Sequence, residues 1–144
     1  MKYPERKTLT EEQMNILLDS ITDVDILSKR DKALLELMYG TGLRISELAK
    51  LNITDIDLAA GKIFVSEGKG KKDRLVPLGK RATKTLKFYV KYTRGHFLKE
   101  ANDKQALFLS LKGNRLKAHN FDHILKKRLK QSKLSGQDIS PHAL

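Results

Sequence analysis

The chain has 144 residues, 40% of them hydrophobic, which is enough for one domain with its own core. It contains no cysteine, which excludes disulfides, thiolate nucleophiles and cysteine-based zinc sites. No apolar run reaches the ~18 residues that a membrane span needs and no secretory signal opens the chain, so we expect a cytoplasmic protein without membrane contact. Residues 1–79 carry 13 basic and 13 acidic side chains, whereas residues 80–144 carry 16 against 4; the net charge of +12 therefore indicates a nucleic-acid partner for the second half.

The first third of the chain predicts three helices. The capping box Thr10-Glu11-Glu12-Gln13 opens a helix that runs to about Ile21. After Ser28, apolar residues repeat at helical spacing, and a second helix should end near Tyr39, where two glycines bracket a turn. A short helix then begins near Arg44. The apolar face of this short helix consists of Ile45, Leu48 and Leu51.

Alternating apolar residues in the next segment predict a small antiparallel sheet of about three strands, around residues 56–58, 63–65 and 75–77. Between the last two strands, residues 67–73 combine glycines with charges that cannot be buried, which is typical of an exposed hairpin tip. The expected fold class is therefore α+β, mainly α-helical with a three-stranded antiparallel sheet.

Two further helices carry basic residues on their outer faces. Residues 80–94 place apolar side chains at helical spacing, with basic residues recurring every three or four positions. A later helix around residues 121–129 has the same amphipathic pattern. We expect both basic faces to bind nucleic acid. Their members are Lys80, Lys84, Lys87, Lys91 and Arg94 on the first helix and Lys126, Lys127 and Lys130 on the second.

Arg44 stands at a helix start with Glu47 one turn away, so the carboxylate can hold the guanidinium rigid for a phosphate. A plain surface ion pair is the alternative. In the hairpin tip, Lys69, Lys71 and Lys72 can deliver an ammonium group into a DNA groove, although lysines that only keep a loop soluble would look the same. The tip lacks the spacing and the hydroxyl of a nucleotide-binding P-loop.

No metal site is expected. His119 and His123 have metal-ligand spacing on a helix, but Asn120 stands where a zinc protease needs glutamate. Asp55 and Asp57 alternate along an extended segment, so their carboxylates should point to opposite faces rather than form a two-metal cluster.

The chain stops soon after a strong helix start. Ser140 suits an N-cap and Pro141 suits the first helical position, yet only three residues follow. Because a one-turn helix at a terminus is unstable alone, we expect the chain to be a fragment that ends inside a helix.

Three segments together resemble the tyrosine recombinase family, in its phage-integrase and Xer branch. They are GTGLRISEL (residues 40–48), GKGKKDRLVPL (residues 68–78) and SPHAL (residues 140–144), and their order and spacing match as well. The resemblance extends from RKTLT (residues 6–10), at the usual opening of the catalytic domain, to the first half of the His-x-x-Arg motif.

The resemblance implies site-specific breakage and rejoining of double-stranded DNA without metal or other cofactor, through a 3′-phosphotyrosyl intermediate. Arg44 looks like the first catalytic arginine, Glu47 like its supporting acid and His142 like the catalytic histidine. Lys69 looks like the lysine that protonates the leaving 5′-oxygen, with Lys71 as the alternative. Further DNA contacts are expected from Lys72, Arg74 and the lysines of the two basic helices.

The second arginine, the nucleophilic tyrosine and the N-terminal DNA-clamp domain of the family have no counterpart in residues 1–144, which we interpret as a partial catalytic domain. Every tyrosine, namely Tyr3, Tyr39, Tyr89 and Tyr92, precedes His142 and therefore cannot match the nucleophile. We expect this fragment to bind DNA without cleaving it and its parent to assemble as a tetramer on paired DNA sites. The alternatives are a noncatalytic basic DNA-binding module and a type IB topoisomerase-like enzyme.

Overall fold

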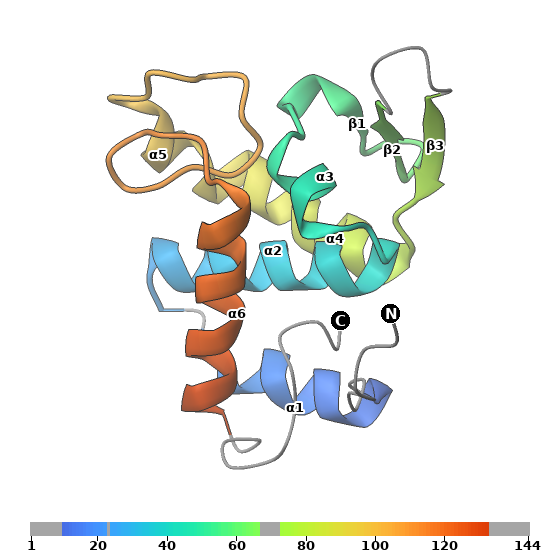
Figure 1. Cartoon of the computed structure of the whole chain (residues 1–144), viewed down its shortest axis with the longest axis vertical. Helices are drawn as coiled ribbons and strands as arrows, with labels where there is room; N and C mark the ends of the chain where they lie inside the picture. Colours follow the sequence, from blue (N-terminus) through green and yellow to red (C-terminus); the bar gives the residue numbers. More distant parts are fainter. Residues whose placement is uncertain (1–9, 23, 67–72, 133–144) are drawn as a thin grey trace, which may run out of the picture.

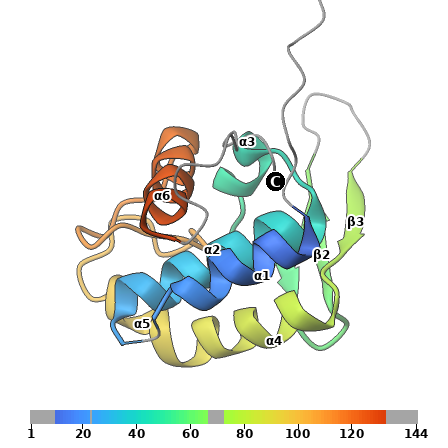
Figure 2. The same ribbon diagram turned by 90° about the horizontal axis from the view of Figure 1, so that it is seen from below.

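The computed structural model describes residues 10–22, 24–66 and 73–132 (Figure 1). Helix α2 (Ile26–Thr41) is central: α1 (Glu11–Ser20) and α4 (Lys80–Phe88) pack against it, and α6 (Ala118–Gln131) packs on α1 and on the short helix α3 (Ile45–Ala49). Seen from below, α4 lies on one side of α2, whereas α3 and α6 lie on the other (Figure 2). The molecule therefore presents two separate helical surfaces.

Local capping chemistry sets the starts of the first two helices, as predicted for α1. Thr10 caps α1 in a capping box, in which its hydroxyl accepts from the Gln13 amide and the Gln13 side chain accepts from the Thr10 amide, both at 3.0 Å. The second helix starts earlier than Ser28, because the Asp25 carboxylate accepts from the Ser28 amide at 2.7 Å and so serves as the N-cap.

The sheet confirms the predicted three antiparallel strands in the order β1-β2-β3, formed by β1 (Ile56–Asp57), β2 (Lys62–Val65) and β3 (Arg74–Pro77). A 3-10 turn (Ile53–Asp55) leads into the sheet. In β2, Ile63 and Val65 are buried while Lys62 and Phe64 are exposed, which is the expected period of two.

Helix α4 continues into a π-helix (Tyr89–Thr93) and then into α5 (Gly95–Leu98), so the predicted uninterrupted helix over residues 80–94 is wrong in its second half. The Arg94 amide bonds to the Tyr89 carbonyl five residues earlier, at 2.8 Å. One extra residue in a turn rotates everything after it by about 100°. As a result Arg94 is 7% exposed, donates to the Ala106 and Lys104 carbonyls and does not belong to the basic face.

The main core is formed by apolar side chains of α1, α2, α4, α6 and β2, with Tyr89, Phe108 and Phe121 among its aromatic members. Tyr89 also donates its buried hydroxyl to the Leu107 carbonyl at 2.8 Å, and burial raises the pKa of its phenol. Within the part of the chain that the structure describes, none of the helices has the length and apolar composition to cross a membrane.

Candidate active site

Two glycines, each for a different reason, build the turn that presents Arg44. Gly40 belongs to the last turn of α2 rather than to the loop, and a Cβ there would lie 3.1 Å from the Leu78 carbonyl oxygen and 3.2 Å from the Ala82 Cβ. Gly42 ends α2 in the left-handed conformation with φ 66°. The chain therefore leaves α2 at Gly42, and Arg44 is exposed at the N-cap of α3.

Glu47 joins this turn to the sheet. One carboxylate oxygen accepts from the Arg44 backbone amide at 3.0 Å, and the other pairs with the Arg74 guanidinium at 3.1 Å. The sequence predicts that Glu47 holds the Arg44 guanidinium; in the structure it binds the Arg44 backbone amide, which fixes where the side chain begins, and its ion pair is made with Arg74. Sequence reasoning missed this partner because Arg74 is 27 residues away from Glu47.

The charge state of Glu47 follows from these contacts. Partial burial is the largest single influence on its carboxyl and opposes ionisation. The hydrogen bonds from the Arg44 amide and the Arg74 guanidinium, together with the positive charges of both arginines, outweigh it and lower the pKa of Glu47. Glu47 is therefore an anion at neutral pH.

Arg74 also marks the base of the predicted cationic hairpin. It pairs with Val65 in the β2–β3 ladder, and the predicted hairpin tip lies between these two residues in the sequence. The predicted site residues Lys69, Lys71, Lys72 and His142 lie outside the described residues. Of the predicted catalytic set, the structure thus brings together Arg44 and Glu47, with Arg74 added.

Helix α6 carries the α6 lysine cluster, defined as Lys126, Lys127 and Lys130, on its exposed face as predicted. Lys126 pairs with Asp122 one turn earlier, at 3.0 Å. This helix lies on the same side of α2 as Arg44, which stands at the start of α3 (Figure 2). The cluster and Arg44 are therefore available on one side of the molecule.

A buried ion network that sequence reasoning did not anticipate anchors α6 to α2. Asp31 accepts from Arg30 with one carboxylate oxygen and from Arg128 with the other, at 2.8 to 3.0 Å. Arg30 also donates to the Leu109 carbonyl. Arg30 and Asp31 stand between Lys29 and Lys32, so the sequence does not distinguish them from neighbouring charged residues, and nothing local pointed to Arg128 nearly a hundred residues later.

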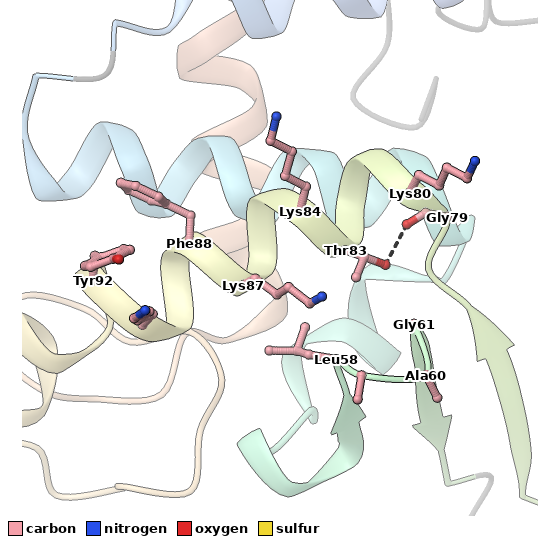
Figure 3. Close-up of a pocket in the computed structure, with 12 residues that line it drawn as sticks. Leu58, Ala60, Gly61, Gly79, Lys80, Thr83, Lys84, Lys87, Phe88 and Tyr92 are labelled. Carbon is pink, nitrogen blue, oxygen red and sulfur yellow. Dashed lines mark hydrogen bonds between the residues drawn. The ribbon is translucent and has the colours of Figure 1, made fainter.

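The lysines of the first basic helix lie on a different side of the molecule from the α6 lysine cluster. Lys80, Lys84, Lys87 and Lys91 are exposed along α4 and the π-helix, on the opposite side of α2 from α6 (Figure 2). They line an open groove together with the turn at residues 58–61 (Figure 3). The structure therefore separates the two basic faces that the sequence treats alike.

The aspartates and histidines considered as metal ligands in the sequence do not form a metal site among the described residues. Asp55 accepts from the Asn52 amide and Asp57 from the Ala60 amide, so both stabilise turns. His119 and His123 are exposed on α6. Among the described residues, no three histidine, aspartate or glutamate side chains gather closely enough to hold a metal ion.

Comparisons with known proteins define the family of this chain. The model of the phage integrase family matches residues 7–144, and the chain belongs to this family. It is 38% identical over 145 residues to the tyrosine recombinase XerD of Proteus mirabilis, covering 99% of this chain and 46% of that protein. The chain therefore spans about half the length of the relatives it matches.

Solved structures share the fold. The XerA recombinase superposes with a TM-score of 0.80 at 25% identity, over 98% of this chain and 48% of that chain. The Tn1549 transposon integrase, in complex with circular intermediate DNA, gives a TM-score of 0.70 at 25% identity, over 99% of this chain and 50% of that one. The predicted fold class, mainly helical with a three-stranded antiparallel sheet, is confirmed by these matches.

Proposed function

We propose that this chain supplies part of the catalytic site of a cytoplasmic site-specific DNA recombinase or integrase that breaks and rejoins double-stranded DNA. The observation that carries the proposal is the linkage of Arg44 to the hairpin base through Glu47, with contacts of 3.0 Å and 3.1 Å. A phosphate needs cations held in place before charge builds on its oxygens. The shared carboxylate holds the Arg74 guanidinium and the Arg44 backbone amide, and so fixes the position from which the Arg44 side chain extends.

In the proposed reaction a tyrosine hydroxyl releases its proton to water and attacks the scissile phosphorus. A 3′-phosphotyrosyl bond forms, the bond to the 5′-oxygen breaks, and that oxygen takes up a proton. The Arg44 guanidinium would hold the non-bridging oxygens together with His142, and Lys69, or Lys71 as the alternative, would donate the proton to the leaving oxygen. Attack by the 5′-hydroxyl of a partner strand then reverses the step and restores the tyrosine.

The DNA would lie on the side of α2 that carries α3 and α6. There the α6 lysine cluster and the hairpin residues Lys71, Lys72 and Arg74 would contact phosphates and position the duplex. Arg74 would serve two purposes, since one of its nitrogens is already engaged by Glu47. The full protein would assemble as a tetramer on paired DNA sites.

The test uses the polypeptide translated from the complete reading frame, incubated with a nicked suicide substrate that traps the covalent protein–DNA adduct. Arg44→Ala should lower the rate of adduct formation by about 10²–10³-fold, the typical effect of losing one preorganised donor, while the Kd for duplex DNA changes only a few-fold. Lys50→Ala, which removes an exposed cation at the other end of α3, is the matched control and should leave cleavage intact. The chain of residues 1–144 alone should form no adduct.

Other outcomes contradict the proposal. Equal losses of cleavage and binding in Arg44→Ala would favour a noncatalytic DNA-binding module. Relaxation of supercoiled DNA without exchange between two duplexes would instead favour a type IB topoisomerase-like enzyme. An adduct formed by residues 1–144 alone would show that the nucleophile lies within this chain.

A further inference from the structure

A groove of about 810 Å³ runs along the outer side of α4, and Arg44 is not among the residues that line it (Figure 3). One wall is α4 with the following π-helix, and the other is the turn at residues 58–61 between β1 and β2. Its volume falls in the range of ligand-binding clefts. The groove can therefore hold an extended chain of small cross-section.

One wall of the groove is strongly cationic. Four lysines line this wall, and we call them the α4 lysine row: Lys80, Lys84, Lys87 and Lys91. None of the described residues that line the groove is acidic. At a rise of about 1.5 Å per residue the row extends about 16 Å along the helix. Figure 3 shows Lys87 extending between α4 and the turn that carries Leu58. Such a row attracts a ligand with repeating negative charges.

Two aromatic rings lie within this cationic wall. Phe88 and Tyr92 are 46% and 56% exposed, and their ring centroids are 4.9 Å apart with the planes tilted by 48°. The Lys91 ammonium is 5.2 Å from the Tyr92 centroid, and the Lys29 ammonium is 5.9 Å from that of Phe88. Large rings that remain this exposed among lysines provide flat surfaces on which a π system can stack.

We propose that this groove binds single-stranded nucleic acid, with the α4 lysine row on the phosphates and the Phe88–Tyr92 pair stacked on an unpaired base. A positively charged groove with aromatic platforms is the arrangement that single strands require. A duplex keeps its bases stacked inside and would leave both rings unused. An acidic peptide would satisfy the lysines but has no general need for flat rings. The site lies on the opposite side of α2 from Arg44 and does not depend on the proposed strand cleavage.

The experiment measures the affinity of the 144-residue chain for fluorescently labelled 12-nucleotide DNA by anisotropy, as a single strand and as a duplex at the same salt concentration. The double variant Phe88→Leu/Tyr92→Leu keeps apolar side chains but removes the rings. It should weaken single-strand binding about tenfold, which is the scale of one lost stacking contact, and change duplex binding less than twofold. Because both rings are exposed, the variant should retain the circular dichroism spectrum and melting temperature of the parent chain.

Matched charge changes separate the two surfaces. Lys84→Gln/Lys87→Gln on α4 and Lys126→Gln/Lys127→Gln on α6 each remove two exposed positive charges. The α4 pair should weaken mainly the single strand and the α6 pair mainly the duplex. Equal effects of both pairs on the single strand would overturn the proposal, as would unchanged single-strand binding in the leucine variant.

Competition identifies the occupant. A poly-glutamate peptide of equal charge should displace the labelled single strand poorly. If poly-glutamate competes as well as unlabelled single strand, and the leucine variant binds both normally, the groove is a site for acidic peptides and the proposal fails. Loss of duplex binding in the α6 pair tests the recombinase proposal separately, since that result does not involve the groove.

Discussion

The most informative single perturbation concerns the buried network that joins α2 to α6. The Asp31 carboxylate is 3% exposed and accepts hydrogen bonds from two guanidinium groups, those of Arg30 and Arg128, which are themselves only 8% and 12% exposed. Asp31→Asn preserves the volume of the side chain but removes the negative charge. Two buried cations would then face each other without a counterion.

Removing one partner of a buried ion pair costs about 3–5 kcal/mol, because the desolvation of the remaining charge is no longer compensated. We therefore expect Asp31→Asn to lower the free energy of unfolding by about 3–5 kcal/mol, measured by urea denaturation followed by circular dichroism. The melting temperature should fall by roughly 10–15 °C, given about 3 °C per kcal/mol for a domain of this size.

The control makes the same chemical change on the surface. Asp122 pairs with Lys126 on α6, where the two side chains are 32% and 61% exposed. Asp122→Asn should cost less than about 0.5 kcal/mol, since an exposed helical pair contributes little. If Asp31→Asn costs less than about 1 kcal/mol, or no more than Asp122→Asn, the network does not hold α6 in place and our reasoning is wrong.

Three further predictions concern the candidate site and the proposed DNA-binding surface. Gly42→Ala should lower the free energy of unfolding by about 1–2 kcal/mol in the same denaturation assay, because the φ of 66° at Gly42 is left-handed. Gly95→Ala is the control and should cost nothing, since a Cβ at Gly95 meets open space. Equal effects of the two substitutions would contradict this reasoning. Because folding lowers the pKa of Glu47, its ionised carboxylate stabilises the fold at pH values above the ordinary pKa of 4.5, and this stabilisation is lost as the pH falls through the lower pKa of the folded state. The difference in free energy of unfolding between the parent chain and Glu47→Gln should therefore vanish at acid pH. A difference that does not depend on pH would refute this prediction. Replacing the α6 lysine cluster by glutamine should make the logarithmic salt dependence of duplex binding shallower by about 0.9 for each lysine that contacts a phosphate, and an unchanged slope would exclude the cluster from the interface.

Much of the candidate site could be predicted from local chemistry. Arg44 stands two residues after Gly42, whose left-handed conformation favours glycine. Glu47 follows three residues later, where a capping carboxylate reaches back to the helix start. The ion partner of Glu47 could not be predicted in the same way. Arg74 reaches it because β3 runs antiparallel to β2 and returns beside α3, and that proximity depends on strand pairing.

The arginines show the same limit. Arg94 continued the spacing of the basic face, but the π-helix turned it inward to the Ala106 carbonyl. Arg115 is drawn into contacts with Asp103 and the Leu51 carbonyl, which come from two separate loops. A positive charge counted in the sequence is therefore not always a charge on the surface, and much of the described surface charge on the helices comes from lysine.

The sequence by itself determined the features that depend on neighbours within one turn or one strand: the caps of α1, the left-handed end of α2, the alternation of β2 and the amphipathic faces of α4 and α6. These follow from backbone hydrogen bonding and side-chain period, which act over a few residues. The tertiary structure decided which side each basic face lies on, which arginines are buried and which cation pairs with Glu47. Those outcomes depend on how α4 packs against one side of α2 while α6 packs on α1 and α3, and packing joins residues whose separation in the sequence carries no local signal.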